Sequence, residues 1–265
     1  MGSKTKIDWC DSTWNPVTGC LNGCEYCYAR GIGNRFGRKQ DQEGIIHELK
    51  KPLRRVYRDD DGVQGIGRKL SYPYGFDPTF HRYKLDEPQH WKKPRTIFVC
   101  SMADLFGEWV PDEWIIEVLE ACRKAPQHRY LFLTKNPERY DRLEGSDLIT
   151  DRDMNFWLGS TTTDIMRDKL HYNSALHTFQ SCEPMLAPWP LARAANQISK
   201  WNGWLPEWVI FGAETGNRKG KVIPEKVWVD NAVQMCRNMG AKVFMKESLR
   251  EIMGPDFRQE FPWEV

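Results

Sequence analysis

The sequence lacks long apolar runs, a marked excess of one charge and any low-complexity tail. In 265 residues no stretch reaches the roughly 20 apolar residues that a membrane-spanning helix needs. The formal net charge is only +2, so bulk electrostatics alone recruits neither nucleic acid nor a membrane. The opening stretch MGSKTKIDWCD also has no apolar core of the secretory type. We therefore expect a cytoplasmic protein without membrane association.

Cysteine is clustered rather than spread evenly. The chain has 8 cysteines, and in a reducing compartment cysteines are more often thiols or metal ligands than disulfides. Cys100, Cys122 and Cys236 fall in apolar or helix-like segments, which predicts buried thiols. The surroundings of Cys182 favour neither role.

Cys20, Cys24 and Cys27 form a C-x3-C-x2-C run in the stretch GCLNGCEYCYAR. This spacing also suits one face of a helix, which would bury the thiols in a row. The glycines and the asparagine of the stretch disfavour that alternative, because glycine inside a helix costs about 1 kcal/mol and asparagine prefers caps and turns. The run is better explained as a loop that wraps a metal group.

Zinc and an iron-sulfur cluster are the candidate metal groups. Structural zinc takes four ligands, and Cys10 is the candidate for the missing fourth, so one alternative is a zinc-stabilised four-cysteine module that binds nucleic acid or protein without catalysis. A [4Fe-4S] cluster with three thiolates keeps one iron open, which suits catalysis, whereas full protein ligation suits an electron carrier. The absence of a fourth ligand in the compact run favours the cluster.

Apolar, β-rich segments alternate with helical segments along the chain. This alternation predicts βαβ units and a parallel sheet covered on both faces. Because the length is close to the roughly 250 residues of an α/β barrel, we expect one α/β domain over 1–265, a partial or near-complete (β/α) barrel with parallel strands and outer helices. An open doubly wound sheet is the alternative. The predicted strands are 6–9, 96–100, 129–134, 156–161, 178–182, 208–213 and 241–246, and the predicted helices are 111–125, 136–145, 163–175 and 224–240.

Residues 36–94 do not follow this alternation. They are rich in glycine, proline and charge and have little periodicity, which predicts a long irregular insertion after a helix that follows the cysteines. A basic stretch from Lys50 to Lys69 is interleaved with Tyr57, Tyr72 and Tyr74, as suits phosphate neutralisation and base stacking. The acidic run 59–61 interrupts it, so a solvated surface is an equal alternative.

The stretch CLNGCEYCYA resembles the C-x3-C-x-aromatic-C signature of radical S-adenosylmethionine (SAM) enzymes. The segments NPVTGC, WKKPRTIFVCSMADLFGEWVP, SCEPML, WVIFGAETG and FRQEFP look like the phage-associated three-cysteine-motif proteins, a radical-SAM-like group. The resemblance implies a barrel of the radical SAM type and a [4Fe-4S] cluster on Cys20, Cys24 and Cys27. In such enzymes the cluster reductively cleaves SAM to a 5′-deoxyadenosyl radical, which abstracts hydrogen from a substrate.

The same resemblance implies partners as well as cofactors. The cluster would need an external electron donor of the reductase, flavodoxin or ferredoxin type. The likeness to phage-associated proteins implies a phage-encoded chain in the host cytoplasm, and it favours a nucleic acid or nucleotide as the substrate.

The residues after the predicted strands supply candidate ligands for SAM. Their order looks like that of the spore photoproduct lyase-like branch of the family. This likeness implies that Lys135 pairs with the SAM carboxylate, that Ser101 or Asp104 takes its ammonium, and that Ser160 bonds the carboxylate or the ribose. The alternative for Lys135 is that it merely begins a helix. The predicted cofactor-binding residues are Tyr26, Ser101, Asp104, Lys135, Ser160 and Thr161.

Three consecutive predicted strands end on a charged residue. Glu183 and Glu214 follow apolar strands, and Lys246 follows the last one. Because the carboxyl ends of barrel strands meet at one edge, these residues predict a polar pocket, with catalytic or substrate-binding roles. Solvent exposure or a structural ion pair is the alternative for each of them.

Overall fold

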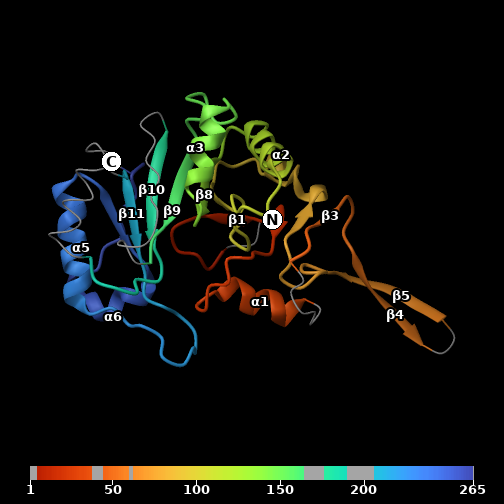
Figure 1. The fold of residues 1–265 in the computed structure, drawn as a ribbon, viewed down its shortest axis with the longest axis horizontal. Helices are drawn as coiled ribbons and strands as arrows, with labels where there is room; N and C mark the ends of the chain where they lie inside the picture. The colour runs from red at the N-terminus through yellow and green to blue at the C-terminus, as the bar shows by residue number, and fades with distance from the viewer. Residues whose placement is uncertain (1–4, 38–43, 60–61, 164–175, 190–205, 265) are drawn as a thin grey trace.

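Figure 1 shows the fold of the computed structural model. The structure describes residues 5–37, 44–59, 62–163, 176–189 and 206–264. Its centre is a 7-stranded sheet, in which every adjacent pair of strands is parallel. In spatial order the strands are β1 (Ser12–Trp14), β7 (Thr96–Val99), β8 (Arg129–Thr134), β9 (Phe156–Thr161), β10 (His177–Cys182), β11 (Trp208–Phe211) and β12 (Lys242–Met245).

This strand order distinguishes the two predicted architectures. From β7 onward each strand lies beside the next strand of the chain, as in a barrel, whereas the order in a doubly wound sheet reverses at a switch point. The sheet curls into a partial (β/α) barrel. The barrel prediction is confirmed, and the doubly wound alternative is wrong.

The predicted strand at 6–9 is also wrong. These residues form a bend and a turn that lead into β1. Trp9 packs on Phe98 with ring centroids 4.6 Å apart, and Asp8 Oδ2 accepts a hydrogen bond from the backbone amide of Glu247 at 2.9 Å. The segment therefore joins the two edges of the open barrel instead of extending its first strand.

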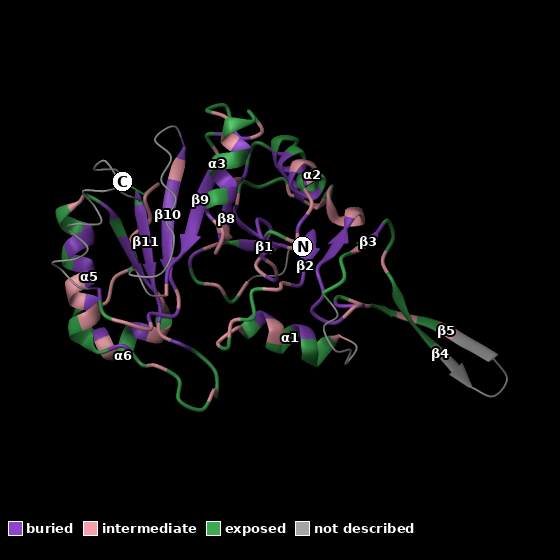
Figure 2. Ribbon diagram, viewed as in Figure 1, coloured by how far each residue is buried: buried purple, intermediate pink, exposed green. Residues whose placement is uncertain are grey.

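The two faces of the sheet bury separate cores, and the strands are buried along almost their whole length (Figure 2). The convex face packs against helices, whereas the concave face holds a largely aromatic cluster. Gly159 makes room for that cluster, because a Cβ there would lie 2.3 Å from the Phe179 ring. The concave cluster consists of Trp9, Phe98, Leu131, Trp157, Phe179, Trp208, Ile210 and Phe244.

The helices over 28–36, 112–123, 138–145 and 226–238 form where the sequence predicts them, whereas the short helix over 250–253 was not predicted. The long ones each bury an apolar face, and predicted helix 163–175 lies outside the described residues beyond 163. No helix in the described ranges is long and apolar enough to cross a membrane. The helices are α1 (Tyr28–Phe36), α2 (Asp112–Arg123), α3 (Glu138–Gly145), α5 (Lys226–Asn238) and α6 (Arg250–Met253), with short 3-10 turns at Arg82–Lys84, Glu87–His90, Glu247–Leu249 and Gly254–Asp256.

Residues 44–94 contain strands where the sequence predicts irregular chain. Three short strands, β2 (Val17–Thr18), β6 (Thr79–His81) and β3 (His47–Leu49), make a second sheet in that order. Strands β4 (Arg54–Asp59) and β5 (Gly62–Lys69) pair only with each other and project from the body of the protein (Figure 1). A ribbon without a buried face needs no apolar alternation, so periodicity could not reveal it.

Candidate functional site

The cysteine loop is fixed by a tight turn at its start. Gly19 has a φ of +87°, and a Cβ there would lie 2.2 Å from the Asp77 carbonyl oxygen. Its amide donates to the Met102 carbonyl at 2.9 Å, and the Cys20 amide donates to the Phe76 carbonyl at 3.2 Å. These contacts seat the loop between β2 and α1, beyond the carboxyl ends of the sheet strands (Figure 1).

The thiols of Cys20, Cys24 and Cys27 are half-buried. Burial raises the pKa of the Cys20 thiol to about 12, against the lowering effect of the Asn22 backbone amide, so binding of a metal group there would release a proton. Cys27 caps α1, since its Sγ accepts from the Arg30 amide at 3.3 Å. In the described part of the chain, no group of three or more His, Cys, Asp or Glu side chains is arranged to hold one metal ion.

A cavity of about 580 Å³ lies at the carboxyl ends of the strands. Its volume falls within the range of roughly 300–1,000 Å³ that is typical of small-molecule sites. Among the predicted site residues, only Ser160 does not line it. The predicted residues that do are Cys20, Cys24, Tyr26, Cys27, Ser101, Asp104, Lys135, Thr161, Glu183, Glu214 and Lys246.

Ser160 and Thr161 lie on opposite faces of β9. Successive strand residues alternate between faces, and Trp157 belongs to the concave cluster whereas Leu158 belongs to the core under the helices. Ser160 shares the parity of Leu158, and Thr161 shares that of Trp157 and lines the cavity. Of these two residues of β9, Thr161 therefore lines the cavity and Ser160 does not.

Lys135 and Ser101 border the cavity beside the cysteine loop. The Lys135 Nζ lies 5.5 Å from the centroid of the Tyr26 ring. The Ser101 hydroxyl donates to Asn15 Oδ1 at 3.2 Å, and its carbonyl accepts from the Tyr28 hydroxyl at 2.9 Å. Both predicted cofactor residues are thus close to the cysteine loop or to the helix that follows it.

Asp104 is buried and engaged by protein donors on both oxygens. Its Oδ1 accepts from Thr134 Oγ1 at 2.6 Å and from the Phe106 amide at 3.2 Å. Its Oδ2 accepts from Asn22 Nδ2 at 2.9 Å and from the Lys135 amide at 3.0 Å. A carboxylate offers about four acceptor positions, and these bonds use them. Asp104 therefore ties the cysteine loop to the ends of β7 and β8.

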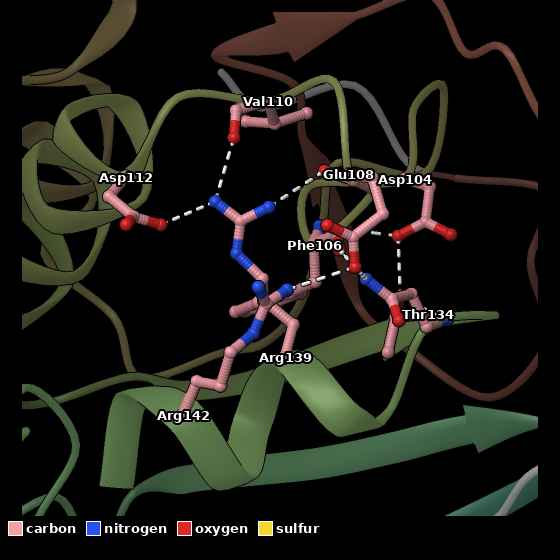
Figure 3. Close-up of polar contacts among 10 residues, drawn as sticks. Asp104, Phe106, Glu108, Val110, Asp112, Thr134, Arg139 and Arg142 are labelled. Atoms are coloured by element: carbon pink, nitrogen blue, oxygen red, sulfur yellow. Dashed lines mark hydrogen bonds and ion pairs between the residues drawn. The ribbon is translucent and has the colours of Figure 1, made fainter. Parts of the chain in front are cut away.

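The loop that carries Asp104 is held by a buried arginine of α3. Figure 3 shows the Arg139 guanidinium reaching the loop backbone and Asp112. Its two terminal nitrogens donate to the Gly107 carbonyl at 3.1 Å and to the Val110 carbonyl at 2.8 Å. This wall of the cavity is thus a closed hydrogen-bonded network.

The opposite wall holds an ion pair between Lys246 and Glu183. Lys246 Nζ lies 2.6 Å from Glu183 Oε2. Burial alone would lower the pKa of Lys246, but neighbouring groups, above all the Glu183 carboxylate, together outweigh burial and hold the pKa above its usual value. The other carboxylate oxygen, Glu183 Oε1, is buried without a hydrogen-bond partner among the described residues, and so are Ser181 Oγ and Trp9 Nε1. All of these residues line the cavity.

Glu214 is paired within the protein. Arg218 donates to its two oxygens at 2.6 and 2.7 Å, and this bond with Arg218 lowers the pKa of Glu214. Arg218 also lies 3.7 Å from the Glu25 carboxylate in the cysteine loop. These contacts favour the structural ion pair among the alternatives for Glu214.

The remaining cysteines do not line the cavity. Cys100, Cys122 and Cys236 are buried as predicted, and Cys182 is buried as well. Cys10, the candidate for a fourth zinc ligand, does not line the cavity, and burial raises its thiol pKa to about 12.

Sequence reasoning missed Asn22, Ser181 and Trp9. Ser181 could have been predicted from the sequence, because it precedes Glu183 by two positions and in an extended strand lies on the same face. Asn22 and Trp9 gave no comparable signal, since their contacts depend on how distant segments pack.

We compared the sequence and the fold with those of known proteins. No curated protein matches the chain. Spore photoproduct lyase complexed with dinucleoside spore photoproduct has a similar structure, with a TM-score of 0.54 and 10% sequence identity over 93% of this chain and 79% of that one. A cysteine-to-serine mutant of that enzyme gives 0.54 and 11% over the same shares, 93% and 79%. At such identities the likeness concerns the fold alone. The sequence matches the family described as Protein of unknown function (DUF5131) over residues 4–250, and the chain belongs to that family.

Proposed function

We propose that the protein is a radical SAM enzyme. The observation that carries this proposal is that the C-x3-C-x2-C thiols and the polar strand-end residues line one cavity at the carboxyl edge of a partial barrel. The likeness of the fold to spore photoproduct lyase supports it.

The residues of the cysteine loop fit a [4Fe-4S] cluster. Thiolates are the ligands that such clusters take, one to each iron, so the thiols do not have to converge on one ion. The helix that begins after Cys27 directs its positive end toward the loop. A bound cluster would supply the electron that cleaves SAM and an open iron that holds it, fed by an external electron donor.

The chain's own residues would bind and orient SAM. The Lys135 ammonium offers three donors to the SAM carboxylate, and the hydroxyls of Ser101 and Thr161 add neutral hydrogen bonds. Tyr26 supplies an aromatic surface at the same edge of the cavity. We assign Asp104 to positioning, because its oxygens are already occupied by protein donors.

The substrate would bind at the wall formed by Glu183 and Lys246. Glu183 Oε1 can accept a hydrogen bond, and Ser181 and Trp9 can donate one, so this wall is equipped for a polar group. Phe98 and Leu133 also line the cavity and would help to exclude water during hydrogen abstraction. We take the substrate to be a nucleotide or nucleic acid; a dinucleoside is the ligand of the similar spore photoproduct lyase structure.

Anaerobic reconstitution with iron and sulfide tests the proposal. We expect about four irons and four sulfides per chain, and conversion of SAM to 5′-deoxyadenosine and methionine after reduction. Alanine at Cys20, Cys24 or Cys27 should abolish both results, whereas Cys10→Ala should preserve them. A colourless single metal, stable in air, would identify the zinc-stabilised module instead. Equal damage from Cys10→Ala would overturn the open-iron site.

A further inference from the structure

The β4–β5 ribbon and the segment that leads into it present a concentration of exposed positive charge. It projects from the body (Figure 1), and its described residues are mostly exposed (Figure 2). Within the described ranges, no ion pair involves a cation of the ribbon or of the segment that leads into it. The exposed cations are Lys50, Lys51, Arg54, Arg55, Arg68 and Lys69.

The register of the ribbon places like charges together. Arg54 lies directly opposite Lys69, and like charges in this arrangement destabilise a strand pair. Val56 lies directly opposite Ile66, and these side chains are 48% and 72% exposed. An isolated two-stranded ribbon is only marginally stable in water. Folding alone does not explain these features, whereas an anionic partner would offset the repulsion and cover the apolar pair.

We infer that the β4–β5 ribbon binds the groove of a nucleic-acid duplex. A two-stranded ribbon fits the major groove, which is about 12 Å wide. Cations near the base of the ribbon would meet the phosphates along the rim, and the apolar pair would face the base edges, where thymine offers a methyl group.

The charge distribution favours a duplex over a membrane surface. The acidic run 59–61 interrupts the basic residues of this segment in the sequence, and an anionic membrane surface would repel it. In a groove, acidic side chains can accept hydrogen bonds from cytosine amino groups, away from the phosphates.

The ribbon is also connected to the candidate site. It leaves the small sheet at β3 and returns to it at β6, and β2 of that sheet lies just before the cysteine loop. The ribbon would thus hold a polymer beside the cavity that treats one of its nucleotides. This use of the ribbon rests on the proposed function, whereas duplex binding itself does not.

Fluorescence anisotropy with a labelled DNA duplex of about 20 base pairs tests the inference. The variant is Arg55→Ser/Arg68→Ser/Lys69→Ser, and the matched control is Lys124→Ser/Arg237→Ser/Lys242→Ser, which removes the same charge from exposed positions elsewhere. The ribbon variant should bind at least about tenfold more weakly, and its slope of log K against log salt should fall by about 0.9 for each lost phosphate contact. The control should stay within about twofold of the wild type. Both variants should keep the wild-type melting temperature.

Several outcomes would overturn the inference. Duplex binding could be weakened equally in the control variant, or could be unchanged in the ribbon variant. The wild-type protein could bind a single strand of the same length more tightly than the duplex. Poly-glutamate could displace the duplex as efficiently as unlabelled DNA does. Cys24→Ala separates the inference from the proposed function, because it should lose SAM cleavage and keep duplex binding. If the wild-type protein bound the duplex but did not cleave SAM, the proposed function would be wrong and the inference about the ribbon would stand.

Discussion

The two walls of the cavity hold their carboxylates differently. At the ends of β7 and β8, Asp104 accepts hydrogen bonds from protein donors on both oxygens. At the ends of β10 and β12, Glu183 pairs with Lys246 through one oxygen, and its other oxygen has no partner among the described residues. The first wall is a completed scaffold, and the second retains capacity for a ligand.

The energetic meaning of this difference follows from burial. A buried polar atom without a hydrogen bond costs about 1–3 kcal/mol, so folded proteins rarely keep several in one place. Trp9, Ser181 and Glu183, which all line the cavity, together hold three such atoms. A bound polar group would offset their cost, whereas Asp104 would gain little from any ligand.

Removing the Asp104 carboxylate should have the largest effect on folding. Asp104→Ala leaves buried donors, including Thr134 Oγ1 and the Lys135 amide, without acceptors, so the free energy of unfolding should fall by about 3 kcal/mol or more. Urea unfolding followed by circular dichroism measures the change.

The matched control on the other wall is Glu183→Gln. It keeps an oxygen near Lys246 but removes the charge that offsets the burial of the ammonium, so the free energy of unfolding should fall, by less than it does in Asp104→Ala. Similar losses in the two variants would show that the walls do not differ in the way described.

The sequence predicted the sheet well because its strands are buried on both faces. Segments such as Trp208–Phe211 are continuous apolar runs, and the helices between the strands show a buried stripe. The prediction of a strand at 6–9 was wrong because Ile7 and Trp9 are apolar for a different reason. They pack in the concave core, where this segment crosses between the two edges of the open barrel.

The site was predictable in its positions but not in its contacts. Residues at the strand ends could be named, yet which face Ser160 or Thr161 presents depends on strand register, which a residue count alone does not fix. The saturation of Asp104 by Asn22 and Thr134 joins segments far apart in the chain, and no local pattern contains it.

Lys135→Ala tests whether Lys135 binds a ligand or belongs to the scaffold around Asp104. Lys135 has no ion pair among the described residues and lines the cavity, so its loss should leave the melting temperature and the cluster content nearly unchanged. Because a charge-assisted hydrogen bond contributes about 1.5–3 kcal/mol, SAM affinity should fall about tenfold or more, as anaerobic titration calorimetry would measure.

The control for Lys135 is Lys124→Ala, which removes an exposed lysine at the end of α2. It should leave SAM affinity as it is. If a folded, cluster-loaded Lys135→Ala protein bound SAM like the wild type, Lys135 would belong to the scaffold with Asp104.

Substitution of Glu214 should give the smallest effect, a change in how the melting temperature depends on pH. Arg218 lowers the pKa of Glu214 in the folded protein, so folding favours the ionised carboxylate. The resulting stabilisation is complete above the ordinary carboxyl pKa of 4.5 and is lost as the pH falls through the lower folded value. The wild-type melting temperature should fall between about pH 7 and about pH 4. If Glu214 belongs to the completed scaffold, this fall should be smaller in Glu214→Gln. The difference should be no more than about 2 °C, because Arg218 is partly exposed. Differential scanning calorimetry at both pH values measures this, with Glu251→Gln as the exposed control. A pH dependence identical to that of the wild type would move Glu214 to the open wall beside Glu183.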